Sequence, residues 1–172
     1  MTSLLLATLL WQGPAVGERA QKLPQLTAKP LSGQTVRIPG EANIAAYVLS
    51  FGFSRKSDQA MKAWREQVFP AFAQEPRVAY YEMPVLQRVP GLIKPLVLRG
   101  MRGSIPKDVQ PRFAPLYQQE AELKALVHFA EPDAAYLVVA KFDGAILWTG
   151  SAPASPERFA ELRKAVAALL AR

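Results

Sequence analysis

The chain has 172 residues, of which half are hydrophobic and one fifth are charged, so it has the length and composition of one folded domain. Its 21 Lys and Arg side chains outnumber 14 Asp and Glu, and the formal net charge of +7 favours an anionic partner. The absence of cysteine excludes disulfides, thiolate catalysis, iron–sulfur clusters and thiolate-bound zinc, and the single histidine leaves little room for a histidine metal site.

Residues 1–17 are interpreted as a remnant of a signal peptide. The apolar run from Leu4 to Trp11 is too short to cross a bilayer and resembles the core of a secretory signal, although the usual positive start is missing. The alternative is a short helix packed on the domain. Residues 18–34 are polar and punctuated by Pro and Gly, so we expect a linker there, followed by a single domain over 35–172.

The first half of this domain is predicted to contain three strands and one helix. A short strand is expected at 35–38, and the nearly continuous apolar run 44–53 is typical of a central strand buried on both faces. A helix capped by Ser57 or Asp58 follows and ends near Pro70 to Pro76, because a proline interrupts helical hydrogen bonding. The third strand is expected at 78–85.

The second half is predicted to begin with an irregular, proline-rich insertion. The expected elements are an insertion at 87–115 with an amphipathic helix over 91–101 that is interrupted at Pro95, a helix over 116–129, a hairpin of 136–140 and 145–149, and a last helix capped by Ser155. A parallel pair joined by a crossover helix, then a hairpin and a terminal helix, is typical of a thioredoxin-like α/β fold. We therefore expect a three-layer sandwich with a mixed central sheet and flanking helices.

The segment that would hold the reactive cysteine of such a fold contains Ser54, Arg55, Lys56 and Ser57. We interpret it as a vestigial active-site position, because the two serines have the spacing of a Cys-x-x-Cys pair but a hydroxyl cannot exchange disulfides. Ser57 is explained as a helix cap, and the two basic residues could bind an anion or simply form a solvated loop. The usual cis-proline would fall near Ala135 or Tyr136, and neither is proline.

Other chemistry has little support in the sequence. A serine hydrolase would need a base for Ser54, and the only histidine, His128, lies far away in sequence without a partner motif, so it is interpreted as a packed or helix-end residue. No phosphate-binding glycine loop or metal-ligand cluster is present. We therefore expect no catalytic residue, no metal and no cofactor.

Most of the excess positive charge lies in residues 87–112, which carry six basic side chains and one acidic side chain. The cations alternate with aliphatic residues, as in an interfacial membrane element or a groove-binding surface. We expect a membrane surface or a membrane-protein subunit to bind here, through Lys94, Arg99, Arg102, Lys107 and Arg112. The alternative is a buried helix whose charged edge faces water. Nucleic acid is disfavoured, because no aromatic stacking platform accompanies the charge.

Six segments carry motifs that occur together in one family, namely 51–54, Ala63-Trp64-Arg65, 98–106, 135–139, Asp143-Gly144 and 145–151. In their order and spacing they resemble the mitochondrial ATP synthase assembly factors numbered ten and their bacterial relatives. The chain departs from the pattern at Ala135 and Leu147, where Gly and Arg are usual. The resemblance implies a thioredoxin-like fold without redox cysteines and a chaperone at the inner membrane that binds the channel subunit of the ATP synthase.

We therefore expect a non-catalytic, thioredoxin-like chaperone or assembly factor for a membrane complex, such as the ATP synthase membrane sector. The location expected for a bacterial relative is exported or periplasmic and membrane-associated, with the mitochondrial inner membrane as the alternative. A second hypothesis is an exported, degenerate thioredoxin- or peroxiredoxin-like binding protein for a peptide or small ligand, with a groove near Ser54 and Tyr136. A third is an enzyme that uses Ser54 or His128.

Overall fold

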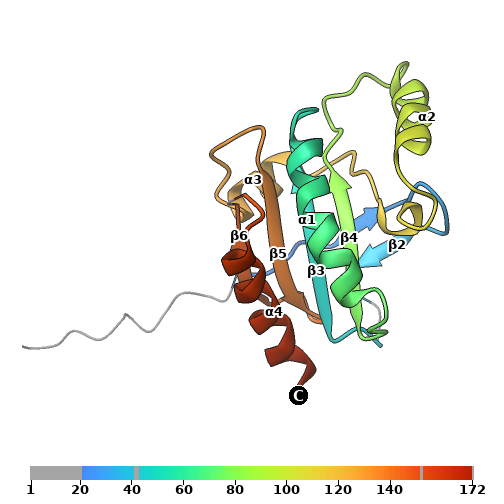
Figure 1. Cartoon of the computed structure of the whole chain (residues 1–172). Coiled ribbons are helices and arrows are strands. Elements are labelled where there is room, and N and C mark those ends of the chain that lie inside the picture. Colours follow the sequence, from blue (N-terminus) through green and yellow to red (C-terminus); the bar gives the residue numbers. More distant parts are fainter. Residues whose placement is uncertain (1–20, 41–42, 152, 172) are drawn as a thin grey trace, which may run out of the picture.

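The computed structural model describes residues 21–40, 43–151 and 153–171. A four-stranded sheet forms its centre, in the order β4-β3-β5-β6 (Figure 1). Its strands are Ala46–Gly52 (β3), Val78–Pro84 (β4), Ala135–Lys141 (β5) and Ile146–Gly150 (β6). β3 runs parallel to β4, while β3 with β5 and β5 with β6 are antiparallel. This is the mixed sheet that the sequence predicts.

β3 is the central strand, and all seven of its residues are buried. Its side chains alternate between the two faces, so Val48 belongs to one apolar core and Leu49 to the other. Both faces of the sheet are covered, which explains why the sequence is apolar throughout this strand.

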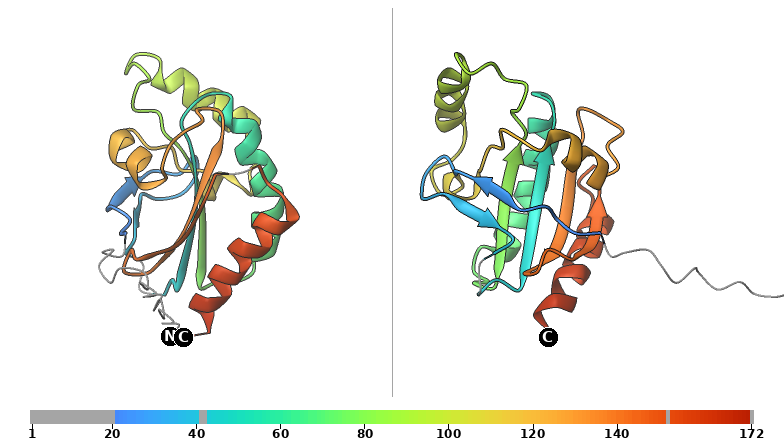
Figure 2. Two further views of the ribbon diagram at one scale, coloured as in Figure 1. Left: turned by 90° about the vertical axis from the view of Figure 1, so that its left-hand side faces the viewer. Right: turned by 180° about the vertical axis from the view of Figure 1, so that it is seen from behind.

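Two helices cover one face of the sheet, α1 (Ser57–Phe72) and α4 (Pro156–Leu170) (Figure 2). They bury an apolar stripe against the strands, with Trp64 and Val68 from α1 and Val166 from α4. The sequence predicts both helices, and Ser155 caps α4 by accepting the Arg158 N–H at 3.3 Å. Helix α1 contains Pro70 and ends at Phe72, within the predicted range of Pro70 to Pro76.

The opposite face is covered by α3 (Glu120–Leu126) and by a two-stranded sheet of β1 (Leu26–Ala28) and β2 (Val36–Ile38). The expected linker over 18–34 is wrong for the residues that the structure describes. Residues 21–34 include β1 and bury Leu23, Leu26 and Leu31, so they are part of the folded domain. The apolar residues of this segment are isolated between polar ones, and such a pattern is too weak to predict a strand.

The insertion contains α2 (Lys94–Ser104) and a 3₁₀ turn over Gln110–Arg112 (η1). Pro95 lies in the first turn of α2, where the missing N–H costs nothing, so the helix begins there instead of being interrupted. α2 contains no buried residue and stands away from the sheet (Figure 1). On α2, Leu98 and Met101 pack against a small apolar cluster that includes Phe113.

The molecule therefore has three layers, with the sheet between α1 and α4 on one side and α3 and the β1–β2 pair on the other (Figure 2). Among the described residues, no helix has the length and hydropathy needed to cross a bilayer. The expected signal-peptide remnant, residues 1–17, lies outside the described residues.

Candidate functional site

The segment between β3 and α1 is shaped by a close approach of the two elements. A side chain at Gly52 would collide with Met61 and with the Ser57 hydroxyl, so glycine is required there. The Ser54 Oγ accepts the backbone N–H of Lys56 at 3.0 Å and of Ser57 at 3.1 Å. It donates its own proton to Asp133 Oδ1 at 2.8 Å. The hydroxyl is therefore used for structure.

The expected cap of α1 is corrected by these contacts. Ser57 is the first residue of the helix, and its hydroxyl donates to the Ser54 carbonyl oxygen at 2.7 Å instead of accepting an N–H. Ser54 does the capping, because it precedes the donors by two and three residues, as a capping side chain must. Both serine hydroxyls of the vestigial position are thus engaged within the turn.

Side chains fill the side of the vestigial active-site position that faces β5. Tyr136 is buried, and its ring packs against Phe53 and Phe129 with centroids 5.7 Å away in each case. Its hydroxyl accepts the N–H groups of Ala130 and Glu131 and donates to the Glu131 carbonyl oxygen. The predicted groove near Tyr136 is therefore occupied by the protein's own side chains.

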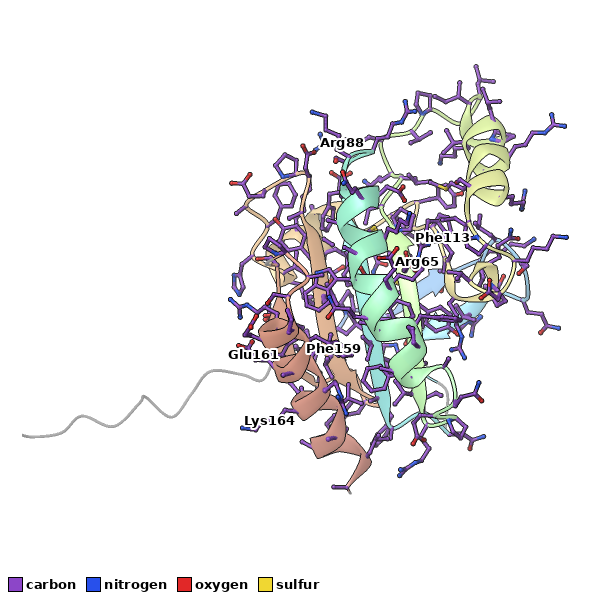
Figure 3. All side chains as sticks on the ribbon, in the orientation of Figure 1. Arg65, Arg88, Phe113, Phe159, Glu161 and Lys164 are labelled. Carbon is purple, nitrogen blue, oxygen red and sulfur yellow. The ribbon has the colours of Figure 1, made fainter. Side chains whose placement is uncertain are left out.

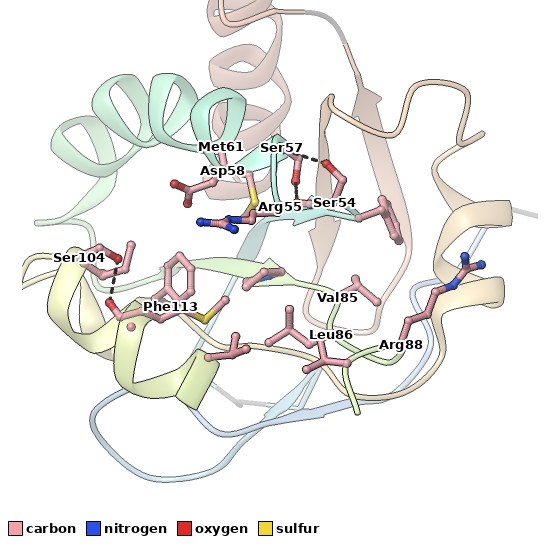
Figure 4. Close-up of a pocket in the computed structure, with 18 of the residues that line it drawn as sticks. Ser54, Arg55, Ser57, Asp58, Met61, Val85, Leu86, Arg88, Ser104 and Phe113 are labelled. Carbon is pink, nitrogen blue, oxygen red and sulfur yellow. Dashed lines mark hydrogen bonds between the residues drawn. The ribbon is translucent and has the colours of Figure 1, made fainter. Parts of the chain in front are cut away.

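A groove of about 800 Å³ lies on the other side of Ser54, between the start of α1, the end of β4 and helix α2 (Figure 4). We call it the α1–α2 groove. Its floor and walls are mostly apolar and include Met61, Val85, Leu96, Val97 and Phe113. A volume of this size, lined mainly by apolar side chains with a few polar ones, is typical of a binding site.

Helix α2 presents one face to this groove. Leu96, Val97, Gly100, Met101 and Ser104 line it, and their spacing of one, three, one and three residues places them on one side of the helix. Leu96 remains 70% exposed although it is aliphatic. An aliphatic side chain facing an open groove is the feature that a bound apolar partner would cover.

Charged groups lie at the edge of the groove. Figure 4 shows Arg55 beside Asp58 and Met61, across from Phe113. Arg88, at the end of the molecule where α1 begins (Figure 3), donates to Glu120 at 3.0 Å. Glu120 is also paired with Lys124 at 2.7 Å, so its charge is compensated twice.

The five basic residues expected to bind a partner differ in their surroundings. Arg102 donates to the Leu31 carbonyl oxygen at 3.2 Å, and Arg112 lies 5.9 Å from the Tyr81 ring. Lys94 stands 4.6 Å above the Tyr117 ring. Arg99 and Lys107 are exposed, and no hydrogen bond or ion pair of theirs is found among the described residues.

A buried polar cluster that the sequence analysis did not single out lies between α1 and β4. The Glu82 carboxylate is fully buried and faces Arg65, with Oε1 to Nε at 3.6 Å. Burial raises the pKa of Glu82 to about 7, although the Arg65 charge and the Tyr80 hydroxyl oppose this shift. Burial likewise raises the pKa of Tyr80. In the sequence, this cluster is indicated by the single carboxylate of Glu82 within the mostly apolar run 78–85.

The remaining catalytic candidate has no supporting geometry. His128 is exposed just after α3, with a positive φ of 50°. The proton of Ser54 goes to Asp133 rather than to an imidazole. Within residues 21–40, 43–151 and 153–171, no group of three or more His, Asp or Glu side chains could hold a metal ion.

Comparison with known proteins finds likeness in structure alone. No family model and no curated protein matches the sequence. A candidate protein disulfide isomerase from Bacteroides thetaiotaomicron has 16% identity and a TM-score of 0.58, covering 90% of this chain and 91% of that one. StoA from Bacillus subtilis has 13% identity and a TM-score of 0.56, with 86% and 99% covered.

An exposed lipoprotein thioredoxin, Etrx1 from Streptococcus pneumoniae, has 14% identity and a TM-score of 0.55, covering 83% of this chain and 98% of that one. These neighbours support the fold and give no evidence for the ATP synthase assembly factors. A chain without cysteine cannot perform the thiol chemistry named for such neighbours. The chain has a thioredoxin-like fold and contains no cysteine.

Proposed function

We propose that this chain is a non-catalytic, thioredoxin-like binding protein whose α1–α2 groove receives an apolar segment of a partner protein. The observation that carries the proposal is the groove itself. It opens beside Ser54 and Ser57, the position that the sequence indicates as a vestigial active site, and it is lined mainly by apolar side chains. Helix α2 of the insertion supplies the second wall.

The composition of the groove suits a peptide segment. Met61 and Met101 have flexible, polarisable side chains that adapt to differently shaped apolar partners. The hydroxyls of Ser54 and Ser57 form hydrogen bonds at the start of α1, which supports a non-catalytic role for both serines. We include export in this proposal, because it was expected from the first 17 residues and one structural neighbour is an exposed lipoprotein.

Photo-crosslinking in cells tests the proposal. A photoreactive amino acid at Val97, in the groove wall, is expected to give one discrete protein adduct, and the same residue at Phe142 on the far hairpin turn is expected to give none. Gly100→Trp should abolish the adduct by filling the groove, whereas Gly103→Trp should not, although both glycines have open space around them. Equal adducts from Val97 and Phe142, or none from Val97, would contradict the proposal.

A second candidate is assembly of a membrane complex, with the ATP synthase membrane sector as the first case to examine. The exposed aliphatic residues of the insertion favour it, since Leu92 is 97% and Ile93 47% exposed next to Lys94. If this candidate is right, the adduct at Val97 contains a membrane subunit of that complex. An adduct with a soluble protein would favour the peptide-binding alternative.

A further inference from the structure

The turn that leads into α2 exposes an unusual concentration of aliphatic side chains. Residues 91–96, which we call the insertion tip, contain Leu92, Ile93 and Leu96, exposed to 97%, 47% and 70%. The tip has a defined backbone, because the N–H of Ile93 donates to the Pro90 carbonyl oxygen at 3.1 Å. Single exposed leucines are common, but three large aliphatic residues within five positions form a patch.

The sequence around this patch carries charge of a single sign. No Asp or Glu occurs between Glu82 and Asp108, while Lys94 lies within the tip and Arg88 and Arg99 flank it in the sequence. The Arg88 side chain is 82% exposed. The start of α1 contributes Arg55, which lines the same groove as Arg88 and Leu96, together with Asp58 and Glu120. Exposed cations thus precede and follow the aliphatic residues in the sequence, at Arg88 and Arg99.

We propose that the insertion tip enters the headgroup region of an anionic phospholipid bilayer, with Leu92 and Ile93 inserted and Lys94 and Arg99 at the phosphates. Aliphatic side chains supply burial in the interface and cations supply attraction to the negative surface. The proposal goes beyond the groove function, since Leu92 and Ile93 do not line the groove.

The charge pattern favours an anionic bilayer over a second copy of the chain as the partner of the insertion tip. A second copy of the chain would bring the same positive charge to the same patch, and like charges would oppose the contact. An anionic bilayer offers negative charge around an apolar interior, which complements cations around aliphatic side chains. Insertion is shallow, because the tip is one turn of backbone and no described helix could cross the membrane.

Labelling at a single site measures this insertion directly, because the chain contains no other cysteine. Full-length Leu92→Cys carrying the dye NBD is mixed with phosphatidylcholine vesicles that contain 30% phosphatidylglycerol, or none. We expect a blue shift and a several-fold increase in emission with the anionic vesicles only. NBD at Phe142→Cys, also exposed but on the hairpin turn, should stay unchanged.

Sedimentation with the same vesicles gives the affinity. The double variant Leu92→Ser with Ile93→Ser should bind at least tenfold more weakly, while Phe142→Ser with Leu147→Ser should bind like the natural chain. Arg99→Gln should weaken binding about fivefold, the effect of one cation near an anionic surface. Circular dichroism verifies that each variant is folded.

The proposal fails if the anionic vesicles do not shift the NBD signal at Leu92, if neutral vesicles bind as well, or if the serine variant retains its affinity. A concentration-dependent dimer in place of vesicle binding would show a protein contact instead. These outcomes leave the groove function untouched, because its test depends on Val97 and Gly100.

Discussion

The buried Glu82 predicts a specific dependence of stability on pH. Its pKa is raised from 4.5 to about 7 in the folded protein, mainly by burial. The folded state therefore holds a proton that the unfolded chain releases at lower pH, so the stabilising contribution of this proton is complete below pH 4.5 and is lost as pH rises through 7. The shift corresponds to a loss of about 2–3 kcal/mol between pH 5 and 8.

Urea unfolding at pH 5, 6, 7 and 8 measures this loss. Glu82→Gln cannot ionise, so the free energy of unfolding of this variant should fall by about 2–3 kcal/mol less than that of the natural chain over the same range. Glu66→Gln removes an exposed carboxylate from α1 and serves as the control for loss of one negative charge.

The partner of Glu82 provides a second comparison. Arg65 lowers the pKa of Glu82, so Arg65→Met should raise it further and move the loss of stability to higher pH. The groups that act on this carboxyl are Arg65, Tyr80 and, more weakly, Asp58. If Glu82→Gln and the natural chain have parallel pH profiles, Glu82 does not hold a proton near neutrality and the reasoning is refuted.

Three further substitutions test the geometry around the vestigial position, each by the free energy of unfolding in urea. Ser54→Ala should cost about 1 kcal/mol, because the start of α1 loses its capping oxygen, and an unchanged stability would show that the cap contributes nothing. Gly52→Ala should cost about 1–3 kcal/mol, since the new methyl group meets Met61 and Ser57; a neutral effect would mean that α1 moves freely away from β3. Tyr136→Phe should cost about 0.5–1.5 kcal/mol, because two part-buried backbone N–H groups lose their acceptor, and an unchanged stability would indicate that water replaces the hydroxyl.

The sequence predicts the sheet and its helices because long apolar runs and clear caps define them. The run 44–53 is buried on both faces as β3, and Ser155 caps α4 as its position before Pro156 indicates. The short strand β1 was missed because its three residues are stabilised by pairing with β2, a contact between segments that no local pattern records.

The site was predicted only in part for a similar reason. The position of Ser54 and Ser57 follows from the order of strand and helix, but their roles as acceptor and donor depend on the turn geometry. The groove exists because α2 stands apart from α1, and the distance between two helices is a tertiary property. The charge surplus of residues 87–112 was clear in the sequence, yet Arg102 and Arg112 turn out to contact the body of the protein.

Protection of single cysteines along α2 tests the binding function most directly. The chain has no native cysteine, so Val97→Cys in the groove wall and Gly103→Cys outside the groove each provide one reactive thiol. A bound partner segment should slow maleimide labelling of Val97→Cys at least tenfold in a native extract, compared with the purified protein, and leave Gly103→Cys unchanged. Equal labelling rates of Val97→Cys in the extract and in the purified protein would contradict the account, because the groove would then be empty where the protein works.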